Sequence, residues 1–370
     1  MRRLSNILVT GGAGFIGSNF IRYLFTRTDF SGRIVNYDAL TYAGNPESLA
    51  DIEAAFGPEG SSGKGRYVFV HGDIRDRESV RAVFKDYAID TVVHFAAESH
   101  VDRSILGPRD FIDTNVMGTF TLLDAAREAW LSGSERNGMQ PDDVLFHHVS
   151  TDEVFGSLGD SGFFNEDTPY DPRSPYSASK AGSDHLVRAY YHTYGLPVTI
   201  SNCSNNYGPY QFPEKLIPLM ILNMVEGKKL PVYGDGKNVR DWLFVEDHNR
   251  AVWLVMNKGK AGDSYTIGGE NEWENIRLVR SLCGIVAGIT AVPEERYTEL
   301  ITFVKDRPGH DRRYAIDCTK IKRELGFTQS VDFQKGLELT ARWYIENTDW
   351  VNRVRSGAYR EWVERNYTKR

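Results

Sequence analysis

The segment "NILVTGGAGFIGSNF", residues 6–20, constrains the fold more than any other part of the chain. A short apolar run ends at Gly11, and Gly11, Gly14 and Gly17 are evenly spaced before apolar residues recur at helical intervals. Glycines allow the backbone to turn sharply and let another group approach it closely. The segment therefore predicts a buried strand that passes directly into a helix.

Similar units recur through the first half of the chain, where short apolar runs alternate with segments of helical periodicity such as residues 18–27 and 78–87. The further candidate strands are "RIVNYD", "RYVFVHGDI", "TVVHFAA", "VLFHHVST" and "PVTISNC". Strands that alternate with helices form parallel sheets covered by helices on both faces. We therefore expect an α/β fold with a Rossmann-type doubly wound parallel sheet.

The alternation weakens after about residue 200. Irregular stretches rich in Pro, Gly and Asn, among them "SNNYGPYQFPEK" and "KDRPGHDRR", separate shorter helices there. Open α/β sheets bind ligands beyond the carboxyl ends of their strands. We expect residues 1–200 to form a Rossmann-like domain, and residues 201–370 to form a smaller, mixed, ligand-binding domain from which some segments return to the first.

Composition excludes several classes of protein. The formal net charge of −6 provides no basic field that would attract nucleic acid. No stretch approaches the roughly 18 apolar residues of a membrane span. Cys203, Cys283 and Cys318 are scattered and suit neither a disulfide framework nor a zinc motif, which favours the reducing cytoplasm. The histidines show no metal-ligand spacing, so we expect no metal and interpret the pair His147-His148 as buried and structural.

Two stretches have the composition of surface loops. Residues 56–65 and 132–143 are rich in Gly, Ser, Pro and charged residues, which predicts mobile insertions. The last 28 residues or so, from about residue 342, instead mix aromatic residues and arginines at helical spacing. They predict a terminal helix that is docked by its Trp and Tyr side chains.

The glycine segment also predicts a dinucleotide site. Free N–H groups and a partial positive charge at a helix N-terminus suit a pyrophosphate. Asp38 ends the next strand, 21 positions after Gly17, close to the spacing expected for an acid that binds a ribose hydroxyl. An acid there repels a 2′-phosphate, which favours NAD over NADP. The alternative is a strand-to-helix turn without a ligand. Asp73, in "GDIRD", ends another strand, from which it could reach the adenine.

Tyr176 and Lys180, in "YSASK", predict redox chemistry. They lie four positions apart, so they share one face of a helix, and a cation beside a phenol lowers the pKa of that phenol. Thr151, at the end of an earlier strand, supplies a hydroxyl that can bind the oxygen being oxidised. The two acids that follow it, Asp152 and Glu153, have no evident task in a simple oxidation.

The motifs "GGAGFIG", "AAESHVDRS", "STDEVFG", "YSASK", "SNNYGPYQFPEKLIP" and "DRPGHDRRYAID" together resemble the nucleoside-diphosphate-sugar 4,6-dehydratases of the extended short-chain dehydrogenase/reductase group. The resemblance runs from about residue 5 to about residue 345, and the insertions 56–65 and 132–143 depart from the usual pattern. It implies NAD as cofactor, a homodimer and a nucleotide-sugar substrate, dTDP-glucose, in deoxysugar biosynthesis.

That resemblance gives the two acids a task. Oxidation of C4 to a ketone makes the C5 proton acidic, after which a base must remove that proton and an acid must protonate the departing 6-hydroxyl. The family triplet implies Glu153 as the base and Asp152 as the acid, with the hydride returning to C6. The alternative is a solvated turn. Adjacent strand residues point to opposite faces, so only an irregular turn lets both acids reach one ligand.

The resemblance also implies a set of binding residues. For NAD they are Gly11, Gly14, Phe15, Ile16, Gly17, Asp38, Leu40, Thr41, Asp73, Ile74, Phe95, Ala96, Ala97, Ser99, Thr114, Tyr176, Lys180 and Asn206. For the substrate they are Ser99, Thr151, Asn205, Lys215, Leu216, Pro231, Tyr233, Arg240, Asn275, Arg307 and His310. Arg240 and Arg307 suit a diphosphate because a guanidinium binds phosphate oxygens in bidentate fashion. The alternative for each is an ion pair with the neighbouring Asp241 or Asp306.

Three other functions fit part of the pattern. A nucleotide-sugar 4-epimerase would use the hydroxyl, Tyr176 and Lys180 but leave Asp152 and Glu153 without a task. A GDP-mannose 4,6-dehydratase would prefer NADP, which Asp38 disfavours. An NAD-dependent sensor without turnover would be expected to lack a member of the Thr/Tyr/Lys set, and this chain keeps all three.

Overall fold

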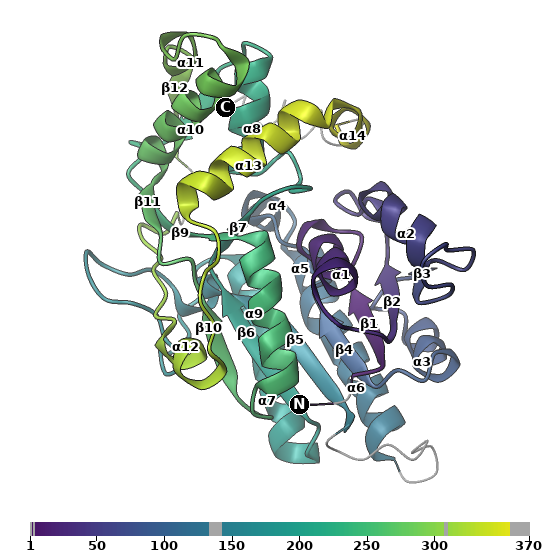
Figure 1. The fold of residues 1–370 in the computed structure, drawn as a ribbon. Helices are drawn as coiled ribbons and strands as arrows, with labels where there is room; N and C mark the ends of the chain where they lie inside the picture. The colour runs from purple at the N-terminus through teal and green to yellow at the C-terminus, as the bar shows by residue number, and fades with distance from the viewer. Residues whose placement is uncertain (1, 3, 133–142, 307–309, 356–370) are drawn as a thin grey trace.

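The computed structural model describes residue 2 and residues 4–132, 143–306 and 310–355. Its centre is a seven-stranded sheet in the order β10-β6-β5-β4-β1-β2-β3, in which every pairing is parallel (Figure 1). The strands are β1 (Asn6–Thr10), β2 (Arg33–Asp38), β3 (Tyr67–His71), β4 (Thr91–His94), β5 (Leu145–Thr151), β6 (Val198–Cys203) and β10 (Ser264–Ile267). The predicted doubly wound parallel sheet is confirmed.

Helices cover both faces of this sheet, which explains why its strands, apart from the edge strand β3, are almost wholly buried. One apolar layer joins the sheet to α1 (Phe15–Arg27), α9 (Val245–Lys258) and α12 (Thr319–Leu325). A second layer joins it to α3 (Arg77–Asp86), α6 (Thr119–Leu131) and α7 (Pro175–Tyr194). Both His147 and His148, in the middle of β5, are fully buried, as predicted.

The second half of the chain builds a smaller, mixed region at one end of the sheet (Figure 1). A three-stranded sheet contains β7 (Asn205–Tyr207), β9 (Val239–Phe244) and β11 (Glu272–Glu274), and a two-stranded sheet contains β8 (Leu230–Tyr233) and β12 (Ile301–Val304). Its own apolar core involves α8 (Leu216–Val225), α10 (Asn275–Thr290), α11 (Glu295–Thr298), α13 (Phe333–Glu346) and α14 (Thr348–Val354). The later strand β10 returns to the large sheet.

Short elements lie between the strands and the covering helices of the large sheet, and some of them carry site residues. They are η1 (Pro46–Leu49), α2 (Ala50–Phe56), α4 (Val101–Leu106), α5 (Pro108–Phe111), the π-helix η2 (Ile112–Gly118) and the 3-10 helix η4 (Asp152–Phe155). Among the described residues, no helix is both long and apolar enough to cross a membrane.

The predicted insertions and the terminal helix have different outcomes. Residues 57–66 form turns between α2 and β3, as predicted for a loop. Residues 133–142, most of the second insertion, lie outside the described residues. In the terminal segment, Trp343 and Trp350 pack against Tyr210, which confirms aromatic docking for the described part of that segment, up to residue 355. That part is divided between two helices, α13 and α14, and is not the single helix predicted.

Candidate active site

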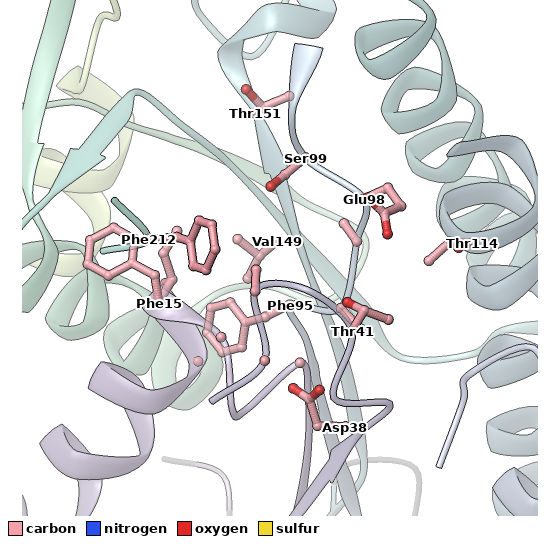
Figure 2. Close-up of a pocket in the computed structure, with 18 of the residues that line it drawn as sticks. Phe15, Asp38, Thr41, Phe95, Glu98, Ser99, Thr114, Val149, Thr151 and Phe212 are labelled. Carbon is pink, nitrogen blue, oxygen red and sulfur yellow. The ribbon is translucent and has the colours of Figure 1, made fainter. Parts of the chain in front are cut away.

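A cavity of about 560 Å³ opens beyond the carboxyl ends of β1, β2, β4, β5 and β6. Figure 2 shows Asp38 and Thr151 at opposite ends of it, with Phe95, Val149 and Ser99 between them. The cavity brings together most of the residues predicted to bind NAD: Gly11, Gly14, Phe15, Ile16, Gly17, Asp38, Thr41, Asp73, Ile74, Phe95, Ala96, Ala97, Ser99, Thr114, Tyr176, Lys180 and Asn206. Thr151, Glu153, Asn205 and Lys215 also line it.

The turn formed by Gly11, Gly14 and Gly17, which we call the glycine corner, has no room for side chains. Gly11 has φ +69°, and a Cβ there would lie 2.7 Å from the backbone of Ala96. A Cβ on Gly17 would collide with the carbonyl oxygen of Gly11. Helix α1 begins just beyond Gly14, without a side-chain cap and without an acidic residue in its first turn. Its free N–H groups therefore suit an anionic ligand, as a pyrophosphate requires.

Asp38 closes one end of the cavity and also braces the backbone around it. Its carboxylate accepts hydrogen bonds from the backbone N–H of Ala13 at 2.9 Å and of Leu40 at 2.8 Å. Burial raises the pKa of Asp38, while these two hydrogen bonds lower it. Leu40 has φ +49° and is not among the residues that line the cavity. The loop after β2 is thus shaped by the same carboxylate that faces the cavity.

A second acid, Asp73, lies beside an arginine that the sequence analysis did not identify. Arg75 donates to both carboxylate oxygens of Asp73, at 2.6–3.0 Å, and both residues line the cavity. Burial raises the pKa of Asp73, but the hydrogen bonds from Arg75 outweigh burial and leave that pKa below its ordinary value. Asp73 is therefore held as a charged acceptor.

Tyr176 and Lys180 lie on the first turns of α7, which begins with a capping box at Ser174. Both side chains are buried and line the cavity. The predicted lowering of the phenol pKa is wrong for this structure: burial, followed by the Glu153 carboxylate, raises the pKa of Tyr176 well above 10. The Lys180 ammonium donates to the carbonyl of Val149 at 2.9 Å, and burial lowers the pKa of Lys180.

The predicted irregular turn after β5 is present. Thr151 ends the strand and its hydroxyl caps η4, accepting from the N–H of Glu153 at 3.3 Å. Glu153 lines the cavity, whereas Asp152 is only 2% exposed. Burial, then the carboxylates of Glu153 and Asp241, raise the pKa of Asp152 well above its ordinary range. The alternative of a solvated turn is therefore wrong, and the two acids lie in unlike surroundings.

Arg240, on β9, belongs to the other side of the site. It is 5% exposed, donates to the carbonyls of Val239 at 2.7 Å and Asp311 at 2.9 Å, and stacks over the ring of Tyr314 at 4.2 Å. The Arg240 charge lowers the pKa of Asp152. The guanidinium therefore lies within electrostatic reach of the turn formed by Asp152 and Glu153, which we call the acid turn. Asp241, its suggested ion-pair partner, accepts from the backbone of Gly269 and Asn271.

The remaining predicted substrate residues lie farther along the second half of the chain. The Tyr233 hydroxyl donates to Asp102 at 3.3 Å, and its ring packs edge-on against His310. His310 in turn pairs with Asp306 at 2.6 Å. Helix α8 begins at Leu216, strand β8 contains Pro231, and helix α10 begins at Asn275. Arg307 falls outside the described residues. Of the described residues among these, none lines the cavity, and neither does Arg240.

Several lining residues were missed. Besides Arg75, they include Tyr42, Glu98, Asp110, Gln211, Phe212 and Glu214. Gln211, Phe212 and Glu214 belong to the quoted "SNNYGPYQFPEK" stretch, so that motif carried the signal although only some of its positions were assigned. Figure 2 shows Phe15 and Phe212 on the same side of the view, and the Phe212 ring packs edge-on against that of Tyr42. Arg75 and Glu98 likewise lie within the quoted "GDIRD" and "AAESHVDRS", whereas Tyr42 and Asp110 lie in none of the quoted motifs.

Comparison with known proteins gives a consistent family. The family model described as GDP-mannose 4,6 dehydratase matches residues 8–340. The chain is 54% identical to dTDP-glucose 4,6-dehydratase 1 of Escherichia coli K12, over 98% of this chain and 99% of that protein. It is 53% identical to the dTDP-glucose 4,6-dehydratase of Neisseria meningitidis serogroup B, over 96% and 98% of the two chains.

Solved structures agree with this result. The dTDP-glucose 4,6-dehydratase of Streptomyces venezuelae, crystallised with NAD bound, superimposes with a TM-score of 0.83 at 46% identity, covering 94% of this chain and 99% of that one. A UDP-glucose 4-epimerase of Thermus thermophilus shares the fold with a TM-score of 0.77 but only 26% identity, covering 92% and 99%. The chain therefore belongs to the dTDP-glucose 4,6-dehydratase family.

Proposed function

We propose that this protein is an NAD-dependent hydro-lyase that converts dTDP-glucose to dTDP-4-keto-6-deoxyglucose and water. The observation that carries the proposal is the acid turn at the end of β5. It brings Asp152 and Glu153 beside Thr151 and next to the buried pair Tyr176 and Lys180. An epimerase on the same fold has no step that uses these two acids. The product belongs to deoxysugar biosynthesis.

The cavity suits NAD on three grounds. The glycine corner leaves space for a pyrophosphate, α1 directs free N–H groups toward it, and Asp38 presents a carboxylate where a ribose would lie. When bound, NAD accepts a hydride from the sugar and later returns it, so the reaction has no net oxidation. The other residues assigned to NAD above are proposed to line its binding site.

The oxidation step falls to Thr151, Tyr176 and Lys180. The Thr151 hydroxyl holds the 4-oxygen of the sugar, and Tyr176, as its phenolate, takes the proton of the 4-hydroxyl as the hydride leaves C4. Burial raises the pKa of Tyr176 and so disfavours that phenolate. The buried ammonium of Lys180, on the same face of α7, stabilises the phenolate before it accepts the proton, which leaves Tyr176 as the neutral phenol.

The elimination step falls to the two acids. Once C4 is a ketone, Glu153 removes the proton from C5. Asp152 is buried, which raises its pKa and favours its protonated form, the form that can give a proton to the departing 6-hydroxyl. Water leaves, and a proton returns to C5 as C6 is reduced. The different burial of the two neighbours thus matches their different roles.

The smaller region is proposed to hold the nucleotide part of the substrate. Arg240 and Arg307 bind the diphosphate, Tyr233 and the strand around Pro231 contact the base, and Asn205 orients the sugar. Lys215, Leu216, Asn275 and His310 complete the same binding surface. In this proposal, residues 1–200 with the returning segments bind NAD, and the rest of residues 201–370 binds the nucleotide-sugar. The burial of Arg240 near the acid turn supports this division.

We also propose a homodimer. Five large apolar side chains are 39–71% exposed on α4, η2 and α6: Ile105, Leu106, Ile112, Met117 and Phe120. These elements contact α7, the helix of Tyr176 and Lys180. An exposed apolar group of this kind suits a second copy of the chain. The proposed location is the cytoplasm, which the three free, buried cysteines support.

Mass spectrometry of the purified protein incubated with dTDP-glucose, without added reductant, tests the function. The expected product is lighter by one water, and it forms without accumulation of reduced cofactor. An unchanged mass with a changed sugar configuration would make the protein an epimerase. Turnover of GDP-mannose in preference to dTDP-glucose would move it to the GDP-sugar group.

A further inference from the structure

A buried acid that the proposed chemistry does not use lies directly behind the site. Asp184 is on α7, four positions after Lys180, so both side chains leave the same face of the helix. Its side chain is fully buried. A carboxylate in this position is costly unless other groups compensate its charge and hydrogen bonds. Its partners therefore indicate what it does.

The carboxylate of Asp184 is surrounded by donors from three elements. One oxygen accepts from the hydroxyls of Ser150 and Tyr170, both at 2.8 Å, and from the amide of Asn202 at 3.3 Å. The other oxygen lies 3.1 Å from Nε2 of His148. Burial raises the pKa of Asp184, but His148, the Lys180 charge and the hydrogen bond from Tyr170 outweigh burial and lower that pKa, which favours the ionised form.

Two of these partners connect Asp184 to the reacting groups. Nε2 of His148 is also 3.5 Å from the Lys180 ammonium. The same imidazole nitrogen therefore lies beside both the Lys180 ammonium and the Asp184 carboxylate. The amide of Asn202 donates to the carbonyl of Thr151 at 3.1 Å as well as to Asp184. A single carboxylate is thus linked to the ammonium on α7 and to the backbone from which the acid turn starts.

The other titratable groups that face Lys180 are uncharged near neutral pH. Burial lowers the pKa of His148, on β5, to about 4, and it lowers that of His94, on β4, well below 6.5. Burial raises the pKa of Cys203, on β6, to about 12, and it also raises that of Tyr176, on α7. Burial lowers the pKa of Lys180, and Asp184 makes the larger of the two electrostatic contributions that oppose burial, the other coming from Cys203.

We propose that Asp184 is a positioning residue of this active site: it is the buried counter-charge that keeps Lys180 cationic, and through Asn202 it fixes the backbone at Thr151. The role assigned to Lys180 rests on the proposed function, whereas the connection between the two buried side chains rests on the contact that each makes with Nε2 of His148. Loss of the carboxylate leaves an unpaired ammonium, which then gives up its proton at a lower pH.

Two experiments on the full-length protein test this inference. The first uses the Glu153→Gln background, in which dTDP-glucose is oxidised at C4 but not dehydrated, so the absorbance of reduced nicotinamide reports the Tyr176–Lys180 step. Asp184→Asn is expected to move the descending, alkaline limb of that rate to lower pH and to reduce the rate at pH 8 by about tenfold. Tyr170→Phe is the matched control: it removes one hydrogen bond to the same carboxylate but leaves the charge, and its alkaline limb should not move.

The second experiment does not depend on activity. Thermal unfolding of Lys180→Met, Asp184→Asn and the double variant forms a cycle, and the double variant should lose less stability than the sum of the single variants because each single change leaves one buried charge unpaired. Tyr170→Phe combined with Lys180→Met should be additive. An additive Lys180–Asp184 cycle, or an alkaline limb that stays in place, would reduce Asp184 to a structural hydrogen-bond acceptor. Absence of reduced nicotinamide in Glu153→Gln would instead count against the proposed function, and the unfolding cycle would still decide the pairing.

Discussion

The two halves of the site are built in different ways. The cofactor half is made by successive strand-to-helix turns at one edge of a parallel sheet, so Gly11, Asp38 and Phe95 reach one cavity although they belong to different units. The substrate half collects Tyr233, Arg240 and other residues from short strands and loops that belong to two small sheets. In a parallel sheet the carboxyl ends of the strands meet at one edge, so residues just after each strand come together. The positions of the substrate residues depend instead on how irregular segments pack.

The acid turn lies where the two halves meet, and its loss should have the largest effect. We expect Glu153→Gln to lower kcat by about a thousandfold, since a positioned general base contributes on the order of 10²–10⁴. Reduced nicotinamide should still form transiently, because oxidation at C4 does not need this carboxylate. Stopped-flow absorbance together with product analysis measures both effects.

Glu338→Gln is the matched control for that change. Glu338 is on α13, where it pairs with Lys335 and Arg342 at the surface. Its turnover should stay within about twofold of the parent, as for other surface changes. Normal turnover by Glu153→Gln would remove the proposed base and leave the family triplet without its task.

The glycine corner allows a sharp test of the cofactor half. Gly11→Ala combines a positive φ with a Cβ that meets the Ala96 backbone at 2.7 Å, so we expect NAD affinity to fall by about a hundredfold and the free energy of unfolding to fall by about 3 kcal/mol. Gly195→Ala is the control, since Gly195 has φ +71° but nothing within 4 Å of its Cβ position. It should lose only about 1 kcal/mol and no affinity. Equal losses in the two variants would show that close approach at Gly11 is unimportant.

The sequence was sufficient for regular features and insufficient for electrostatics. The alternation of strand and helix patterns and the spacing of the glycines predicted the parallel sheet. The position of Thr151-Asp152-Glu153 after a strand correctly predicted an irregular turn at Asp152. The sequence predicted a lowered pKa for Tyr176, whereas burial and the nearby Glu153 raise it. The four-residue spacing to Lys180 carries no information about either of these effects. The environment of Asp184 depends on partners from β5, β6 and a loop, which no local pattern brings together.

The substrate half should respond to changes independently of the cofactor half. We expect Arg240→Gln to raise the KM for dTDP-glucose by about tenfold to fiftyfold, since hydrogen bonds to a charged group contribute roughly 1.5–3 kcal/mol. NAD affinity should not change, because Arg240 is not among the residues that line the cavity. Steady-state kinetics, NAD titration and thermal unfolding separate a binding loss from the loss of its bonds to Val239 and Asp311.

Arg342→Gln is the control for Arg240→Gln, because Arg342 lies on the surface of α13 and pairs with Glu338. It should leave both constants in place. If Arg240→Gln weakened the binding of NAD as much as that of dTDP-glucose, the two halves would be energetically coupled. The two halves would then differ in how they are built but would not bind their ligands independently.

The smallest effect is expected at Asp38, where the question is selectivity. Asp38→Asn removes the charge that repels a 2′-phosphate, and it leaves one amide oxygen where two carboxylate oxygens now accept from Ala13 and Leu40. NAD affinity should fall by about threefold to tenfold, the loss of roughly one hydrogen bond, while NADP affinity rises relative to it. Titration of both cofactors gives the ratio directly. A ratio that does not change would mean that the carboxylate acts only as a brace for the loop after β2, so that selectivity would arise from other groups around the ribose.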